Sequence, residues 1–153
     1  MRSSYDPPSS RTHLSVLKLG YNNLGDDEED DNEDDDTNNT EKELQPVDDL
    51  ACLGGFKCME ELYLGGTSMK STGCPSISNM LLTNLSLRTI CLSDNNLNNQ
   101  DLSLFSQSLS RNREFPLETL LLSFNKLTCV RVETLMNATW GSTSLREIEL
   151  DNN

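Results

Sequence analysis

Histidine and aromatic residues are scarce in this chain, and their scarcity excludes several kinds of site. His13 is the only histidine among 153 residues, and aromatic residues make up only 5%. The five cysteines are irregularly spaced and include no Cys-x-x-Cys pair, whereas a zinc site needs ligand pairs at short spacing. The sequence therefore predicts no metal ion or other cofactor, and free thiols rather than disulfides.

Long apolar runs and basic stripes are also missing. No stretch approaches the roughly 18 to 20 apolar residues that a membrane span needs. The opening segment MRSSYDPPSSRT lacks the apolar run of a signal peptide. Nor does a basic stripe appear that would balance nucleic-acid phosphates. We therefore expect a cytoplasmic or nuclear protein that binds neither membranes nor nucleic acids directly.

Acidic residues are concentrated in one segment, 26–36, which reads DDEEDDNEDDD. Its 10 acidic residues, subtracted from 25 in the chain, leave 15 against 12 lysines and arginines, so most of the net charge of -13 belongs to this segment. Ten charges that repel each other and have no apolar anchor predict a disordered insertion at about 25–40. The acidic residues are Asp26, Asp27, Glu28, Glu29, Asp30, Asp31, Glu33, Asp34, Asp35 and Asp36.

Three interpretations of this acidic loop remain open. It is a solubilising loop, or a flexible segment that attracts basic partners, or a calcium site. The segment lacks the glycine turn and the spaced ligands of an EF-hand loop, which argues against calcium. Attraction of a basic partner would weaken with salt, because charges are screened over roughly 8 Å at physiological ionic strength.

The pattern L-x-x-L-x-L-x-x-N-x-L, with some substitutions, occurs four times and begins a fifth time. The copies start at Leu14, Met59, Leu87, Leu117 and Leu145, at spacings of 45, 28, 30 and 28 residues. The acidic segment lies inside the long first spacing, so it reads as an insertion that leaves the later register intact. Thr67 stands where the other copies have asparagine. Such regular spacing predicts a repeat protein.

Each copy predicts a short strand, a turn and a helix. Alternating leucines bury one face of a strand, asparagine suits the turn because its side chain can bond free backbone groups, and stacked units share one apolar core. We expect Asn99, Thr128 and Pro75 near the starts of three helices, and a fourth helix at about 46–53. The expected buried faces are Leu102, Phe105 and Leu109; Val132, Leu135 and Met136; and Ile77, Leu81 and Leu85.

Over residues 14–153 the chain resembles the ribonuclease-inhibitor-like class of leucine-rich repeat proteins. The resemblance implies an α/β solenoid shaped as a horseshoe, with parallel strands on the concave face and helices on the convex face. Residues 1–12 are then a flexible tail, and 13–153 form a domain of about four and a half repeats. Because no polar capping unit is visible, we expect a fragment of a longer protein, whose uncapped last repeat can self-associate.

Side chains that flank the strand leucines are predicted to point into the hollow of this horseshoe. Apolar and aromatic residues there are typical binding anchors, and the acidic residues near the last strand favour a basic element in the partner. The alternative is a neutral, solvated face whose partner docks elsewhere. The predicted binding residues are Lys18, Tyr21, Tyr63, Cys91, Asp94, Leu121, Phe124, Glu147 and Glu149.

These patterns predict a protein-interaction scaffold and not an enzyme. The sequence contains no glycine-rich phosphate loop and no Ser/His/Asp set, and Cys91 has no histidine nearer than His13, two repeats away. The alternative is a regulator such as a GTPase activator, an activity that the resemblance includes. That activity would use an arginine near a loop, but nothing in the sequence marks one of them as special.

Deleting the segment Gly25–Asn39 should leave the fold intact, because a solvated loop contributes little to the core. Shortening a flexible loop changes the closure entropy only slightly, so we expect the free energy of unfolding to change by less than about 1 kcal/mol. Thermal melting followed by circular dichroism checks this. Loss of cooperative melting in the deletion variant would show that the segment is structural.

Overall fold

The computed structural model describes residues 14–22, 24, 50, 53, 56–69, 71–112 and 114–153. These residues form a five-stranded sheet in the order β1-β2-β3-β4-β5, with every neighbouring pair parallel. The acidic segment and the tail 1–12 lie outside the described residues, as does most of the predicted helix at 46–53. The strands are β1 (Val16–Lys18), β2 (Glu61–Tyr63), β3 (Thr89–Cys91), β4 (Thr119–Leu121) and β5 (Glu147–Glu149).

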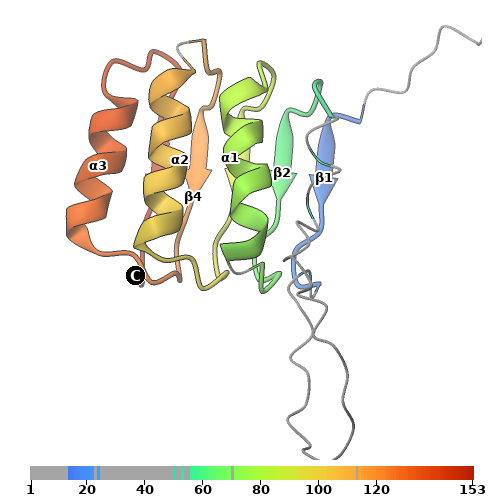
Figure 1. Cartoon of the computed structure of the whole chain (residues 1–153). Coiled ribbons are helices and arrows are strands. Elements are labelled where there is room, and N and C mark those ends of the chain that lie inside the picture. The colour runs from blue at the N-terminus through green and yellow to red at the C-terminus, as the bar shows by residue number, and fades with distance from the viewer. Residues whose placement is uncertain are drawn as a thin grey trace, which may run out of the picture.

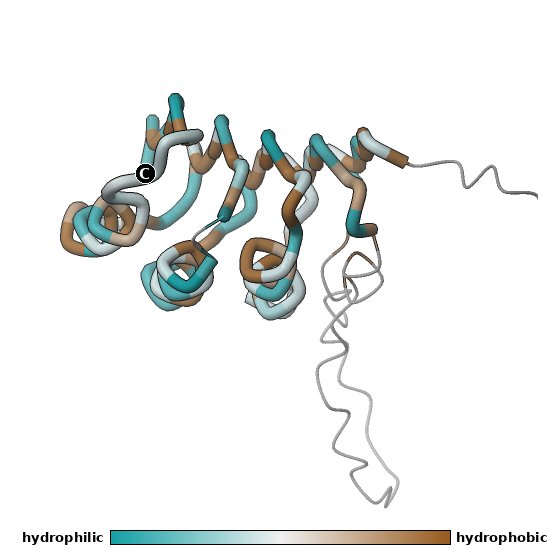
Figure 2. Tube along the Cα trace, turned by 90° about the horizontal axis from the view of Figure 1, so that it is seen from above, coloured by the Kyte–Doolittle hydropathy of each residue, from teal (hydrophilic) through white to brown (hydrophobic). Residues whose placement is uncertain are grey.

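The helices lie side by side on one face of this sheet, so the molecule has two layers (Figures 1 and 2). The predicted α/β architecture with parallel strands is confirmed. The row of strands is not curled in Figure 2, so the curved horseshoe is not seen in this length of chain. The helical segments are the short 3₁₀ helix η2 (Ser71–Gly73), α1 (Cys74–Thr83), α2 (Asn99–Arg111) and α3 (Cys129–Thr139).

The strand register follows the repeat pattern without a slip. The central residue of each strand pairs with the central residue of the next, from Leu17 through Leu62 and Ile90 to Leu120 and Ile148. Since successive side chains of a strand point to opposite faces, this register directs every central residue toward the helices and its two neighbours away from them. The residues that flank the strand centres therefore form aligned rows on the face away from the helices.

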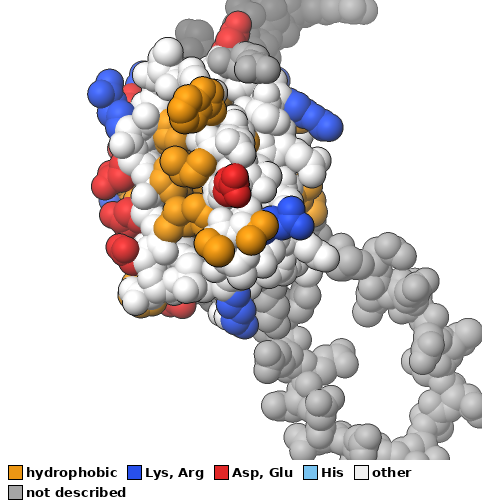
Figure 3. Space-filling view, turned by 90° about the vertical axis from the view of Figure 1, so that its left-hand side faces the viewer, with side chains coloured by type: hydrophobic (Ala, Val, Ile, Leu, Met, Phe, Trp, Pro, Cys, Tyr) orange, Lys and Arg blue, Asp and Glu red, His pale blue; other side chains and the backbone are white. Residues whose placement is uncertain are grey.

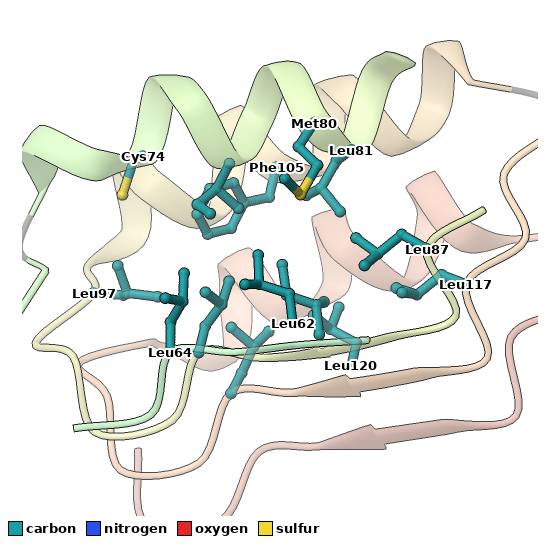
Figure 4. Packing of buried hydrophobic residues seen from close by; sticks show 14 of the residues in the cluster. Leu62, Leu64, Cys74, Met80, Leu81, Leu87, Leu97, Phe105, Leu117 and Leu120 are labelled. Atoms are coloured by element: carbon teal, nitrogen blue, oxygen red, sulfur yellow. The ribbon is translucent and has the colours of Figure 1, made fainter. Parts of the chain in front are cut away.

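Apolar residues at matching positions of successive units form one core between the sheet and the helices (Figure 4). Leu64, Leu92 and Leu122 are fully buried in it, and Leu19 packs against it from the first unit. Units two to four are the best buried, because they have a described neighbour on both sides. The buried repeat residues of those units are Met59, Leu62, Leu64, Met69, Leu87, Ile90, Leu92, Leu97, Leu117, Leu120, Leu122 and Leu127.

Buried asparagines tie the third and fourth units to the units before them. The Asn95 amide oxygen accepts hydrogen bonds from the Thr67 and Met69 backbone N–H groups at 3.1 and 3.2 Å, and its nitrogen donates to the Leu64 carbonyl at 2.7 Å. Asn125 repeats this arrangement one unit further on. Because a buried backbone group without a partner costs stability, these side chains fix both the turn and its neighbour.

Thr67, which stands in the place of asparagine, supplies partners for the turn in a different way. Its hydroxyl lies 2.9 Å from the Leu64 carbonyl of its own turn and 2.9 Å from Asn95 Oδ1. The side chain is too short to serve the preceding unit, so the Leu24 N–H instead donates to the Thr67 backbone carbonyl at 2.8 Å. The substitution thus keeps the turn but replaces one side-chain link by a backbone link.

The predicted helices are correct in position but wrong in some details. The cap of α2 is Asn98 and not Asn99: its side chain accepts from the Gln100 and Asp101 N–H groups, and Asp101 accepts from the Asn98 N–H. Pro75 lies in the first turn of α1, as predicted. Leu85 lies beyond the end of α1 and is exposed, because the chain has already turned toward β3.

The buried face of α3 is also narrower than predicted. Leu135 is the one buried residue of this helix, Val132 is partly buried and Met136 is 48% exposed. Thr128 precedes α3, but its side chain makes no capping hydrogen bond and its hydroxyl lies near Asn99 Oδ1 instead. This helix has a described helix on one side only, which leaves its outer face uncovered. None of the described helices is long and apolar enough to cross a membrane.

Replacing Asn95 by alanine should destabilise the protein by about 2–4 kcal/mol, because several buried backbone groups lose their partners. Asn22 supplies a matched control, since it is exposed and, within the part of the chain that the structure describes, bonds the carbonyls of Leu19 and Gly20 in its own turn. The variant Asn22→Ala should cost about 1 kcal/mol or less. Equilibrium denaturation in urea measures both, and equal losses in the two variants would contradict the role given to the buried amide.

Candidate interaction surface on the open face of the sheet

The sheet face that is not covered by α1, α2 and α3, here called the open face, carries the candidate site. Each strand leads into a turn whose fourth residue after the strand centre has a positive φ, between +54° and +67°. Backbone hydrogen bonds of 2.8–2.9 Å join these turns across the units, for example from the Phe124 N–H to the Asp151 carbonyl. We call the five residues at this position of the turns the turn row, and they are Tyr21, Gly66, Asp94, Phe124 and Asn152.

Two members of the turn row are residue types that this backbone conformation disfavours. Glycine, asparagine and aspartate adopt a positive φ with little cost, but a bulky side chain does so at a cost of order 1–3 kcal/mol. Tyr21 and Phe124 nonetheless occupy such positions, and their side chains are 89% and 59% exposed. Burial in the core therefore does not offset the strain, which points to a role outside the fold.

A trough of about 780 Å³ runs along this part of the open face. Aromatic rings rise from a floor of small residues, and three carboxylates border it. Six of the nine predicted binding residues line it: Tyr21, Tyr63, Cys91, Asp94, Phe124 and Glu149. The remaining lining residues are Gly20, Gly65, Gly66, Ser93, Ser123, Asp151 and Asn152.

The ring of Tyr21 lies directly over Gly66. A Cβ atom added to Gly66 would come within 2.7 Å of Tyr21 Cδ1 and 2.9 Å of Cε1. Glycine is thus required at this position for two reasons, the positive φ of +67° and the ring above it. The Tyr21 ring consequently occupies the space above Gly66 that a side chain would otherwise fill. Asp94 is the next residue of the turn row after Gly66.

Tyr63 in the centre of the open face is already engaged within the chain. The Lys18 Nζ lies 4.9 Å from the centroid of its ring, a cation–π contact. The Tyr63 hydroxyl donates to Glu61 Oε2 at 3.1 Å. Partial burial, then the hydrogen bond and the charge of Glu61, raise the pKa of Tyr63 above its ordinary value of 10.0.

The other predicted residues lie on the open face outside the trough. Leu121 is half-buried on β4, and Glu147 is exposed on β5. The small residues of the trough floor were not among the predicted binding residues, and nothing in the sequence indicates that their smallness creates a hollow. The acidic loop residues, Asp26 to Asp36, lie outside the described residues.

A second surface, at the α3 end of the molecule, was only partly anticipated. Figure 3 shows hydrophobic side chains gathered on this end, with acidic side chains along one edge. Val130 and Trp140 are 65% and 87% exposed there, and Trp140 also borders a small cavity of about 180 Å³ between the ends of α2 and α3. Leu145, Ile148 and Leu150, from which self-association was predicted, are partly buried against the core.

Comparison with known proteins gives one informative similarity. The chain is 30% identical over 115 residues to the human protein "NACHT, LRR and PYD domains-containing protein 5", whose name includes leucine-rich repeats. The match covers 74% of this chain and 9% of the human protein, so the chain spans less than a tenth of that relative's length. No family model matches the chain. This similarity and the parallel sheet together fit a leucine-rich-repeat-like protein.

Titration of the Tyr63 phenol should give a pKa above 10.0, measured as the ultraviolet difference spectrum between the wild type and Tyr63→Phe. The folded state raises this pKa, so its contribution to stability is complete below the unfolded value and is lost as the pH rises through the raised one. Replacing Glu61 by glutamine should lower the pKa but leave the part that is due to burial. An ordinary pKa in the wild type would contradict the contact with Glu61.

Proposed function

We propose that this chain is a protein-interaction scaffold that binds its partner on the open face of the sheet. One observation carries the proposal: Tyr21 and Phe124 are exposed aromatic residues in a strained backbone conformation beside a trough. Strained residues cluster at functional sites, and exposed aromatic residues in a hollow are frequent binding hot spots. The similarity to a protein named for leucine-rich repeats agrees with such a role.

The proposal includes the finer class of the fold. We assign the chain to the ribonuclease-inhibitor-like leucine-rich repeats, in which the open face would be the concave side of a horseshoe. The support is the spacing of 28 to 30 residues between the later copies of the motif and the presence of an α-helix between successive strands from β2 to β5. Over more units, a small rotation at each step would accumulate into curvature.

The remaining parts of the proposal concern how the chain acts and in which compartment of the cell it works. We propose that the chain acts by binding and not by catalysis, that it works in the cytoplasm or nucleus, and that the acidic segment attracts basic partners. The GTPase-activator alternative needs a free arginine near a loop. Arg88 is paired with Glu118, and no observation on the described residues favours Arg111 or Arg131 for this role.

Partner capture should depend on the open face. The double variant Tyr63→Ala/Leu121→Ala removes its two large central side chains, and we expect the amount of co-purified partner to fall at least about tenfold, as for loss of a hot spot. Quantitative mass spectrometry after affinity capture, at two salt concentrations, measures this. Capture of a specific partner by the wild type establishes the reference.

The matched control is Arg131→Ala/Glu133→Ala, which truncates two exposed residues of α3 on the helix layer. This control should capture the partner as the wild type does, and both double variants are checked by thermal melting. An unchanged partner profile for Tyr63→Ala/Leu121→Ala, with intact melting, would refute binding on the open face. A loss of captured partner in the α3 control alone would show that the binding surface lies on the helices.

A further inference from the structure

We propose that Tyr21, Asp94 and Phe124 form a seat for an arginine side chain of the partner. The inference rests on the proposed function, since it specifies what the trough on the open face accepts. It starts from the turn row, in which backbone hydrogen bonds join successive turns and Gly66 alone separates Tyr21 from Asp94 and Phe124.

The order of the turns places the carboxylate of Asp94 between two positions that carry an aromatic residue. The ring of Tyr21 lies over Gly66, the neighbour of Asp94 on one side, and Phe124 is its neighbour on the other. Adjacent strands are about 4.8 Å apart, so the positions of Gly66 and Phe124 are separated by roughly 10 Å. A cation held at Asp94 would lie one strand spacing, roughly 5 Å, from each of these two positions, and cation–π attraction acts over about 6 Å.

The charge around the seat matches a basic ligand. The lining of the trough includes three carboxylates, from Asp94, Glu149 and Asp151, and no lysine or arginine. Asp94 itself is exposed and has no ion pair among the residues that the structure describes. A cation that enters the trough therefore meets three negative charges along its walls, while the Lys18 ammonium lies over the ring of Tyr63, one of the lining residues.

Arginine fits this arrangement better than lysine. A guanidinium is flat, so it can stack against an aromatic ring while its edge donates two hydrogen bonds to one carboxylate. The same face already holds one cation against an aromatic ring, since Lys18 lies over the ring of Tyr63. The seat of Tyr21, Asp94 and Phe124 has the rings and the acid but lacks its own cation.

The strain in the turn row supports a binding role over a structural one. Asn152 occupies the equivalent position in the fifth unit, and asparagine tolerates a positive φ. The fold would therefore accept asparagine at positions 21, 94 and 124 at equal or higher stability. The rings of Tyr21 and Phe124 persist where a smaller residue would suit the backbone better, as expected if a ligand contacts them.

The test uses the whole chain and three synthetic nonapeptides of glycine and serine, each with one central arginine, lysine or citrulline. Citrulline has the shape of arginine without its charge. Binding is followed by NMR, using the backbone amides of the turn row and the ring signals of Tyr21 and Phe124. We expect the arginine peptide to shift these signals and to bind about tenfold more tightly than the citrulline peptide.

Two variants of the protein test whether Asp94 and Phe124 contribute to binding of the arginine peptide. Asp94→Asn and Phe124→Asn should each weaken binding of the arginine peptide about tenfold, with a melting temperature equal to or above that of the wild type. The control Glu133→Gln removes an exposed acid of α3, far from the turn row, and should leave binding unchanged. Since the acidic segment is intact in all variants, the difference between them reports on the seat alone.

Several results would overturn the seat. These are equal affinity for arginine and citrulline, tighter binding of lysine than of arginine, shifts confined to α3 or the acidic segment, or unchanged binding by both variants. The wild-type comparison of peptides decides the matter even if a variant fails to fold. If the seat fails while Tyr63→Ala/Leu121→Ala still loses its captured partner, the proposed function stands; if that capture is also unchanged, both fall.

Discussion

Everything in this structure depends on how each turn after a strand is tied to the unit before it. A buried side chain, such as that of Asn95, replaces the backbone partners that a sharp turn would otherwise lose, and an unpaired buried backbone group is costly. In each of these turns the residue just before the asparagine adopts a positive φ. The same constraint that aligns the leucines therefore also creates the turn row on the opposite face.

The residues on the two faces of the sheet consequently serve different purposes. On the helix side, leucine, isoleucine and methionine at matching positions are buried almost completely, and their packing stabilises the stack. On the open side, the positive φ of the turn row favours glycine or asparagine, yet two of its five positions hold exposed aromatic residues. The core is arranged for stability, whereas the turn row gives up some stability, which is the pattern expected of a binding surface.

The trough also shows why a list of exposed residues does not define a site. Lys18 and Tyr63 belong to the predicted binding row, but they contact each other, so part of the Tyr63 ring is already covered. The hollow instead arises where glycines and serines separate Tyr21 from Phe124. Two of its three carboxylates, those of Glu149 and Asp151, belong to the fifth unit, so a partner that spans the trough would meet most of the negative charge at that end.

The sequence by itself determined the repeat, the parallel strands, their register and the rows of the open face, because leucine spacing and the asparagine turn are local patterns that act within one unit. It located α2 but misassigned its cap by one residue, since Asn98 and Asn99 are equally good caps until Asp101 closes the box with Asn98. It also could not show that Met136 is exposed, that Lys18 covers Tyr63, or that the Tyr21 ring rests on Gly66. Those contacts join residues of different units or depend on which face a neighbour covers, so only the tertiary structure decides them.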